Sequence, residues 1–299
     1  MTPLERAPAA LAAFAGRDGL WLKREDLHEL GMFKWRSTLP VVRQLAGDAV
    51  VTSSTGNHGA AVAWACKEVG VRAIVFVPPG GSPPKLALLE RLGAEIRVAG
   101  HDLDEAKDAA RSYATAQGLP FFEDGAEPLQ YEAYEAIGDE ILAQCESQPA
   151  VVVTPIGNGA LAGGVGTALG KRAPGVLRVG VVAREMPVMA ASYEADAPVD
   201  VPAGRTIADG LAVRVAIPLA VERLRTAVDL MLRVSERELA EALVACHDAG
   251  VAIEPSAAAA LAAVPKLPEG DPVVLVLTGR NLDPAVLERA RHDPDSFDI

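Results

Sequence analysis

Lys34 stands among apolar residues in the string GMFKWR, with Met32 and Phe33 before it and Trp35 after it. A lysine in an apolar pocket loses the solvation of its ammonium group, so its neutral, nucleophilic amine becomes more accessible. Such an amine can form a Schiff base with an aldehyde cofactor. The alternative is that Lys34 lies on a surface helix, with its stem on Phe33 and its ammonium group in water. The other motifs of the chain decide between these two interpretations.

The string SSTGNHG, residues 53–59, follows a predicted strand and opens a predicted helix. Backbone N–H groups at such a turn attract an anion, and the helix dipole adds to the attraction. The hydroxyl groups of residues 53–55 add further donors, and Gly56 and Gly59 allow a ligand to come close to the backbone. Taken alone, the string is equally consistent with an ordinary strand-to-helix turn that has a polar cap.

A glycine-rich turn, IGNGALAGG, follows the apolar run VVVTP. Gly157 and Gly159 leave backbone N–H groups bare ahead of a predicted helix, and this geometry holds a phosphate. The spacing of these glycines and Ala162 also matches the relaxed dinucleotide-binding pattern, so an NAD-linked oxidoreductase is an alternative. Against it, the acidic residue that would bind the ribose is poorly placed, since Glu185 stands behind Arg184.

The string VVLVLTGRN, residues 273–281, predicts a buried strand that ends in Thr278 and turns at Gly279. Ligands of open α/β sheets gather at the carboxyl ends of the strands. A hydroxyl group at that place can hydrogen-bond a neutral heteroaromatic nitrogen, whereas a carboxylate would hold the nitrogen protonated. The alternative interpretation is a threonine that caps the following segment. An NAD-linked oxidoreductase would leave both this string and Lys34 unexplained.

Composition and charge limit the function. The chain has 299 residues, of which 50% are hydrophobic and 4% aromatic, which suits alanine-rich helices packed on valine-rich strands. The formal net charge of −12 argues against a nucleic-acid or anionic-membrane partner. The three cysteines are far apart and lack CxxC spacing, which predicts neither a disulfide framework nor a zinc site. No signal peptide and no apolar stretch that could cross a bilayer is recognised, so we expect a soluble cytoplasmic protein.

Short apolar runs alternate with helical patterns along the chain, which predicts an α/β fold with parallel strands and crossover helices. The segment 191–204 is rich in Pro, Asp and Ala and predicts a loop. Strands are expected at residues 49–52, 73–77, 95–98, 151–155, 176–182 and 273–278. Helices are expected at residues 60–69, 83–92, 104–117, 132–145 and 235–249, the last of them opened by a capping box of Ser235 and Glu238.

Five motifs occur in one order along the chain: KREDL with GMFKWR, SSTGNHG, IGNGALAGG, TIADGLAV and LTGRN. Together they resemble the fold-type-II pyridoxal-phosphate enzymes, which include serine and threonine dehydratases, serine racemase, threonine synthase and cysteine synthase. The resemblance implies a tryptophan synthase β-like fold of two open twisted α/β sheets, with pyridoxal 5'-phosphate in the cleft between them. It also implies a homodimer, a large domain of residues 1–45 and 131–299, and a small domain of residues 46–130 inserted in it.

Residue roles carry over at the matching positions of these motifs. The family pattern SFKxRGA reads MFKWRST here, so Lys34 resembles the Schiff-base lysine. Asn57 would contact the 3-hydroxyl group of the cofactor, and Thr55 would take the place of an acid/base serine on the opposite face. Thr278 matches the serine that pairs with the pyridine nitrogen. The resemblance implies a phosphate loop of Gly157, Asn158, Gly159, Ala160 and Leu161, a site for the substrate carboxylate at Ser53, Ser54, Thr55, Gly56, Asn57 and His58, and Gly210 and Glu254 as further candidates.

Departures from the family pattern concern the substrate more than the cofactor. Ser37 and Thr38 replace the usual Gly-Ala after the lysine motif, and Asn158 and Ala160 replace two glycines of the phosphate loop. The stretch EAYEAIGDEI lacks the usual GQGT-like signature. Ala183 stands where serine racemase needs an acidic metal ligand, so we expect no metal there.

The string TIADGLAV is most similar to the dehydratases and racemase of the family. We therefore expect a lyase that converts a hydroxy amino acid into a 2-oxo acid and ammonia, with Lys34 as the base that takes the α-proton and the cofactor ring as electron sink. A neutral Thr278 partner weakens the sink, which favours prompt loss of a β-substituent over transamination. A threonine synthase, a β-replacement synthase and an amino-acid racemase are alternatives, although no basic cluster for a phosphorylated substrate is identified. Few residues follow LTGRN, so no regulatory domain is expected after it.

Overall fold

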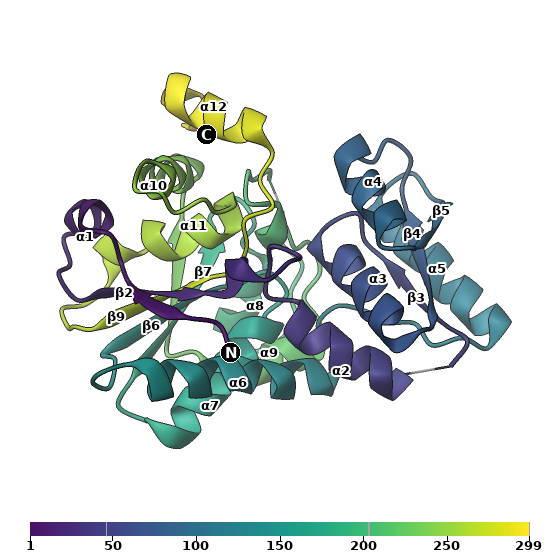
Figure 1. Ribbon diagram of the computed structural model, residues 1–299, viewed down its shortest axis with the longest axis horizontal. Coiled ribbons are helices and arrows are strands. Elements are labelled where there is room, and N and C mark those ends of the chain that lie inside the picture. The colour runs from purple at the N-terminus through teal and green to yellow at the C-terminus, as the bar shows by residue number, and fades with distance from the viewer. Residues whose placement is uncertain (46, 203, 299) are drawn as a thin grey trace. The chain divides into compact units, whose positions relative to one another are not determined.

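The computed structural model describes residues 1–45, 47–202 and 204–298, and these residues form two compact units (Figure 1). The large unit comprises residues 1–33 and 134–299, and the small unit comprises residues 34–133. The small unit includes Lys34 and helix α2 (Trp35–Leu45), because that helix packs against helix α3 (Asn57–Val69). Whether residues 46–130 form an inserted domain stays a prediction.

A six-stranded sheet forms the centre of the large unit. Strand β1 is antiparallel to its neighbour, and the other five strands run parallel. Val273 pairs with Leu20 on one side and with Val151 on the other, so β9 joins the N-terminal strands to the rest of the sheet. In sheet order the strands are β1 (Leu4–Arg6), β2 (Leu20–Arg24), β9 (Val273–Leu277), β6 (Val151–Pro155), β7 (Leu177–Ala183) and β8 (Leu230–Val234).

Helices cover both faces of this sheet (Figure 1). The fully buried helix α11 (Pro255–Ala262) packs on one face, beneath α10 (Glu236–Asp248) and α1 (Ala9–Ala15). Helix α7 (Ala160–Arg172) packs on the opposite face, with α9 (Pro218–Ala227) and α6 (Pro128–Gln144) against it. The remaining helices of this unit are α8 (Val188–Ala195), α12 (Pro284–His292) and the 3₁₀ helices Glu25–Leu27, Asp209–Leu211, Val264–Lys266 and Pro294–Phe297.

Helices α6 and α7 come very close at Gly138. A Cβ atom built on Gly138 would lie 2.8 Å from Cβ of Ala168 and 2.9 Å from the carbonyl oxygen of Val165. Real Cβ atoms almost never make contacts this short. The approach therefore explains why a glycine interrupts an otherwise helix-forming segment.

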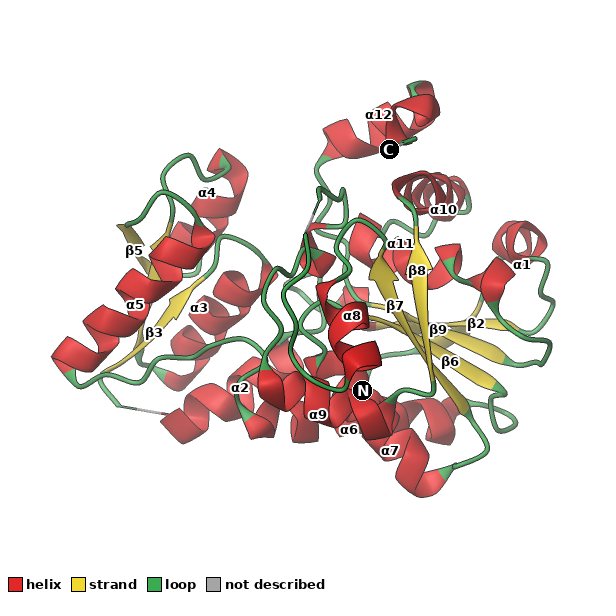
Figure 2. Cartoon of the chain, turned by 180° about the vertical axis from the view of Figure 1, so that it is seen from behind, coloured by secondary structure: helices red, strands yellow, loops and turns green. Residues whose placement is uncertain are grey.

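The small unit is a three-stranded parallel sheet in the order β3 (Ala49–Ser53), β4 (Arg72–Val77) and β5 (Glu95–Val98). Val51, Ile74 and Phe76 pack with alanines of α5 (Leu103–Gln117) in one apolar cluster. Helix α3 packs against β3 and β4 on the opposite side of the sheet, and α4 (Pro83–Arg91) contacts β5 (Figure 2). The sheet thus has the alternating β–α order that the sequence predicts.

The predicted α/β fold with parallel strands is confirmed, and so is the capping box of Ser235 and Glu238. One element was wrong: the predicted loop 191–204 begins inside helix α8, which continues to Ala195. Val188 and Met189 are buried, and this packing outweighs the loop-like composition that follows. The helix ends where Asp196 adopts a left-handed conformation, with φ of 58°.

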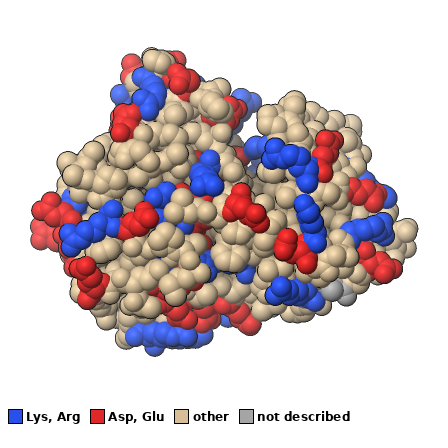
Figure 3. Space-filling view, viewed as in Figure 1, with Lys and Arg blue, Asp and Glu red and all other residues tan. Residues whose placement is uncertain are grey.

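Acidic and basic side chains are interspersed over the face in view in Figure 3. The described residues contain no helix long and apolar enough to cross a membrane.

Candidate functional site

Lys34 directly precedes helix α2, and the first turn of that helix fixes its backbone. The carbonyl oxygen of Lys34 accepts hydrogen bonds from the backbone N–H groups of Ser37 and Thr38, at 3.1 and 3.0 Å. The hydroxyl groups of the same two residues donate to the same oxygen, at 3.3 and 3.0 Å. Both residues are fully buried. The two hydroxyl residues that replace the usual Gly-Ala are therefore satisfied locally.

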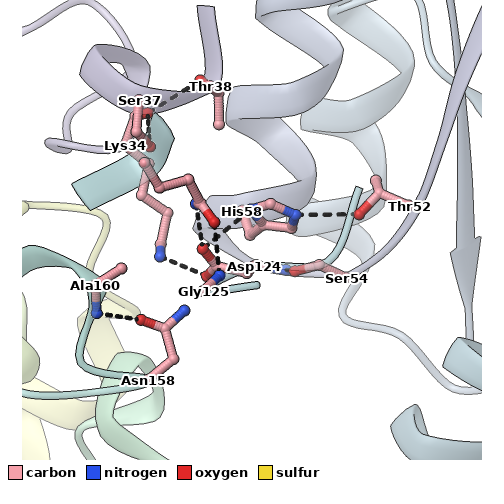
Figure 4. A network of polar contacts seen from close by, with 12 residues as sticks. Lys34, Ser37, Thr38, Thr52, Ser54, His58, Asp124, Gly125, Asn158 and Ala160 are labelled. Carbon is pink, nitrogen blue, oxygen red and sulfur yellow. Dashed lines mark hydrogen bonds and ion pairs between the residues drawn. The ribbon is translucent and has the colours of Figure 1, made fainter. Parts of the chain in front are cut away.

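The amine of Lys34 forms an ion pair with Asp124 (Figure 4). The distance from Nζ to Oδ2 is 2.7 Å, and the two side chains are 15% and 23% exposed. Gln130 donates from Nε2 to the other oxygen, Oδ1, at 3.0 Å. Burial by itself would raise the pKa of Asp124. The opposing influences outweigh burial and lower the pKa: they are the charges of Lys34 and His58 and the hydrogen bonds from Lys34 and Gln130. Asp124 is therefore ionised at neutral pH.

Asp124 reaches this place because the segment before it pairs with β3. The backbone N–H of Phe122 donates to the carbonyl oxygen of Val51 at 2.8 Å, and Val51 forms a parallel bridge with Phe121. The next residues therefore leave the sheet at the carboxyl end of β3. There the backbone N–H of Gly125 donates to Oε1 of Gln130 at 2.7 Å, which ties the loop to the start of α6.

His58 lies behind Asp124, with its ring 6% exposed (Figure 4). Its Nδ1 atom is 3.5 Å from Oδ1 of Asp124, and its Nε2 atom is 3.1 Å from Oγ1 of Thr52. The ring packs edge-on against Phe122, with 4.9 Å between the ring centres. Burial lowers the pKa of His58, and the charge of Lys34 lowers it further, against the opposing charge of Asp124. The imidazole is therefore neutral at neutral pH.

The turn between β3 and α3 has the form of an anion site. Helix α3 begins at Asn57 and not at residue 60, so its N-terminus lies within the string SSTGNHG. The N–H of Gly56 donates to Oγ of Ser54 at 3.1 Å, and a Cβ atom on Gly59 would lie 2.2 Å from the carbonyl oxygen of Ser54. Within the described chain the hydroxyl of Ser53 is buried and has no hydrogen-bond partner. Glycine is thus required at residue 59 for the turn to close on the helix.

The large unit carries a second turn that is suited to an anion, between β6 and α7. A Cβ atom on Gly157 would lie 2.3 Å from the carbonyl oxygen of Gly210, and Gly159 has φ of 96°. Asn158 accepts at Oδ1 from the N–H of Ala160, at 3.0 Å. Among the described residues, no acceptor is found for the N–H groups of Gly157, Asn158 and Gly159. Free N–H groups ahead of a helix N-terminus are suited to a phosphate.

Thr278 follows the buried strand β9 and is 4% exposed. Its backbone oxygen accepts from the N–H of Phe33 at 3.0 Å. Its hydroxyl group is buried and has no hydrogen-bond partner within the part of the chain that the structure describes. Glu254 lies beside the same strand end, where its N–H donates to the carbonyl oxygen of Gly279 at 3.0 Å and its carboxylate accepts from the N–H of Asn281 at 3.2 Å.

Each unit therefore gathers part of the predicted site. The small unit brings Lys34 into contact with a loop beside the SSTGNHG turn, although the ring of His58 turns inward to Thr52 and Asp124. In the large unit two of the predicted residues lie against each other, Gly157 of the phosphate loop and the further candidate Gly210. The sequence predictions that lie at the carboxyl ends of β6 and β9 in the large unit are Gly157, Asn158, Gly159, Ala160, Leu161 and Thr278.

Sequence reasoning missed three residues of these sites: Asp124, Gln130 and Ser256. The hydroxyl of Ser256 accepts from the N–H of Gly210 at 3.0 Å and holds the backbone that meets the glycine loop. Asp124 had a detectable signal, because it follows the short apolar run that ends in Phe122 and precedes a glycine. Among the described residues, no group of three His, Cys, Asp or Glu side chains is placed to hold a metal ion.

Comparison with known proteins decides the family. The family described as "Pyridoxal-phosphate dependent enzyme" matches residues 1–279. The chain belongs to this family. It is 32% identical over 277 residues to an L-threonine ammonia-lyase of Thermotoga maritima, covering 90% of this chain and 69% of the relative.

Two solved structures of threonine deaminases are similar to this family member. The processed form of isoform 2 from Solanum lycopersicum has a TM-score of 0.90 and 26% identity, covering 97% of this chain and 86% of that one. The threonine deaminase from T.th. has a TM-score of 0.85 and 31% identity, covering 94% of both chains. The predicted fold type and the predicted cofactor, pyridoxal phosphate, are confirmed. The NAD-linked alternative is thereby set aside.

The residues present fit this cofactor. In the small unit Lys34 would offer an amine to its aldehyde. In the large unit the glycine loop would offer unpaired N–H groups to its phosphate, and Thr278 would offer a buried hydroxyl to its ring nitrogen. An orphaned hydroxyl is costly inside a protein, so a partner for Thr278 is expected from the bound group.

Proposed function

We propose that this protein is a pyridoxal-phosphate-dependent ammonia-lyase that acts on a hydroxy amino acid. The amino acid loses its α-hydrogen and its β-hydroxyl group as water, and hydrolysis of the resulting aminoacrylate gives a 2-oxo acid and ammonia. The relatives named as threonine ammonia-lyases and threonine deaminases support this activity.

The observation that carries the proposal is the orphaned hydroxyl group of Thr278. The bound cofactor supplies an electron sink for the bond electrons of the substrate α-carbon. A neutral hydroxyl partner does not force a proton onto the ring nitrogen, whereas a carboxylate would. A weaker sink favours rapid departure of a β-substituent, as elimination requires, over the long-lived carbanion that transamination requires.

Lys34 is proposed as the base that takes the α-proton. Its ion pair with Asp124 places a carboxylate oxygen 2.7 Å from the nitrogen that takes the proton. The first turn of α2 fixes the backbone of Lys34, so the side chain that carries the amine starts from a rigid position. Positioning of this kind contributes to the rate, because the base is held ready near the reacting atom.

The turn of residues 53–58 is proposed to bind the substrate carboxylate, with Thr55 as an acid/base group on the opposite face. The N-terminus of α3 and the orphaned hydroxyl of Ser53 support the first role. Asn57 is proposed to contact the cofactor. We also propose that the enzyme is a homodimer in the cytoplasm, on the strength of the family resemblance, and size-exclusion chromatography with light scattering tests the dimer.

The test is release of 2-oxo acid by the cofactor-loaded protein, given L-threonine, L-serine, D-threonine and D-serine separately. Lys34→Ala, loaded with cofactor, is the control for background. Oxo acid from one substrate, absent in the variant, supports the lyase and fixes its stereochemistry. If all four are inert while the cofactor absorbance band is intact, the lyase proposal is wrong and a synthase takes its place.

A further inference from the structure

In the small unit, the carboxylate of Asp124 lies between two groups that can each carry a positive charge. Lys34 is 2.7 Å from one of its oxygens, and Nδ1 of His58 is 3.5 Å from the other. Gln130 adds a neutral donor at 3.0 Å. Figure 4 shows Lys34 and His58 on the two sides of Asp124. A buried carboxylate is costly unless a cation faces it, so the pairing with Lys34 matters to its stability.

The hydrogen bonds around His58 assign its tautomer. The hydroxyl of Thr52 donates to the carbonyl oxygen of Phe122 at 2.8 Å, so its oxygen is free only to accept from the ring. Nε2 of His58, 3.1 Å from that oxygen, therefore carries the hydrogen. The neutral ring then presents the lone pair of Nδ1 to the carboxylate, and among the described residues Nδ1 has no hydrogen-bond partner. Two acceptors thus face each other across 3.5 Å, with room for one proton.

We propose that Lys34 and His58 exchange the role of countercharge to Asp124: when Lys34 loses its positive charge, His58 takes up one proton at Nδ1. In balance, the lysine ammonium gives up one proton to become an amine, and the imidazole gains one to become an imidazolium. The N–H so formed at Nδ1 points at Oδ1 of Asp124. Asp124 thereby faces one cation in either state.

One further charge acts on His58, that of Glu123, and it has the same sign as the charge of Asp124 but a smaller effect. Glu123 stands next to Asp124, but it is paired with Lys107 at 3.3 Å and with Arg111 at 3.0 Å on helix α5. The remaining neighbours of the ring, Thr52 and Phe122, are neutral. Burial and the charge of Lys34 lower the pKa of His58, and the charge of Asp124 is the largest influence that raises it, ahead of a hydrogen bond to the backbone of Phe122 and the charge of Glu123. Loss of the charge on Lys34 removes one lowering influence and leaves the raising ones in place.

The exchange would give the enzyme a proton store beside its base. Lys34 must be an uncharged amine to accept the α-proton, and it becomes an ammonium on doing so. His58 would hold one proton while Lys34 is an amine, and it would give that proton to water when Lys34 takes the α-proton and becomes an ammonium. This catalytic use rests on the proposed lyase function, whereas the exchange itself depends only on the residues of the small unit.

The test is the titration of the His58 ring by NMR, in the full chain labelled at histidine and freed of cofactor. The chain has five histidines, so His58→Gln assigns the signal. We compare the wild type with Lys34→Met, which removes the charge, and with Lys34→Arg, which keeps it. Lys34→Met is expected to raise the proton affinity of His58 by about tenfold or more, because a nearby like charge is removed. Lys34→Arg is expected to leave it near the wild-type value, and the exposed His292 serves as an internal control.

A double variant isolates the part of Asp124. In Lys34→Met with Asp124→Asn, the tenfold gain is expected to disappear, because the carboxylate that faces Nδ1 of His58 is gone. Circular dichroism checks that each variant is folded. If Lys34→Met unfolds, the comparison is made with Lys34→Arg, in which His58 must titrate as it does in the wild type. Equal titration of His58 in the wild type and in Lys34→Met overturns the proposal. Oxo acid release decides the lyase function separately, so the two can fail independently.

Discussion

Replacement of Gly157 by alanine tests whether the glycine loop holds the cofactor phosphate. The added Cβ atom would lie 2.3 Å from the carbonyl oxygen of Gly210. Carbon–oxygen contacts are normally about 3.3 Å or longer, so the loop or its neighbour must move by about 1 Å. The atom that it meets belongs to the backbone, which cannot rotate away as a side-chain end can. Overpacking of this kind costs about 1–3 kcal/mol.

The cost of Gly157→Ala is expected to appear in cofactor binding or in stability. If the loop moves, its N–H groups leave their places and pyridoxal phosphate binds about 5- to 150-fold more weakly, by the conversion of 1.4 kcal/mol to a factor of ten. If the loop holds, the melting temperature falls by roughly 2–4 °C for each kcal/mol. Titration of the cofactor-free protein followed by absorbance, together with a thermal melt, measures both.

A matched variant separates the clash from the effect of any added methyl group. Gly47→Ala places its Cβ atom where no other atom lies within 4 Å, so neither cofactor binding nor melting is expected to fall. The reasoning is refuted if Gly157→Ala binds the cofactor and melts as the wild type does. It is also refuted if Gly47→Ala shows the same losses.

Three further predictions concern contacts within the large unit. Gly138→Ala is expected to lower the melting temperature. The clash of the new Cβ atom with Ala168 costs about 1–3 kcal/mol, which exceeds the gain in helix propensity of up to about 1 kcal/mol. A higher melting temperature would contradict the close approach. Thr278→Val is expected to weaken cofactor binding by about 2- to 12-fold without lowering the stability of the cofactor-free protein. Thr278→Ser keeps the hydroxyl group and is expected to preserve binding. Equal cofactor affinities of Thr278→Val and the wild type would remove Thr278 from the site. Hydrogen bonds from Arg178 lower the pKa of Asp229 below its ordinary 3.8, so the stabilisation is present above that pH and is lost as the pH falls through the lowered value. Asp229→Asn should therefore lower the melting temperature at pH 7 and have little effect in strong acid, and a pH-independent difference would count against the ion pair.

The sequence predicted the local structure of those parts of the candidate site that depend on neighbours in the chain. The turn at Gly157 and the strand end at Thr278 each carry their signal within about ten residues, because strand, glycine and helix follow one another. The local sequence marks Asp124 as a polar residue after a short apolar run, but it does not indicate the contact with Lys34, which spans 90 residues and depends on the pairing of Phe121 with Val51. Only the register of that short bridge brings the carboxylate to the lysine.

Tertiary packing also explains the other differences. Helix α8 forms within a segment of loop-like composition because Val188 and Met189 are buried in the large unit. Helix α2 belongs with the small unit because it packs on α3, and no local pattern in the sequence reports that choice. The alanine-rich stretch that begins at Ser256 is a fully buried helix, because small side chains allow α11 to lie close to the sheet.

The central place of β9 in the sheet has a consequence for the order of folding during synthesis. Strands β1 and β2 leave the ribosome first, yet β2 has no place in the sheet until β9, some 250 residues later, has been made. The strands of the small unit all lie between residues 49 and 98, so that unit can form while the large unit is still incomplete. A nascent chain that stops before Val273 should thus expose its N-terminal strands to chaperones. Because Thr278 follows β9, the proposed partner of the cofactor's ring nitrogen is made only after all the strands of both sheets.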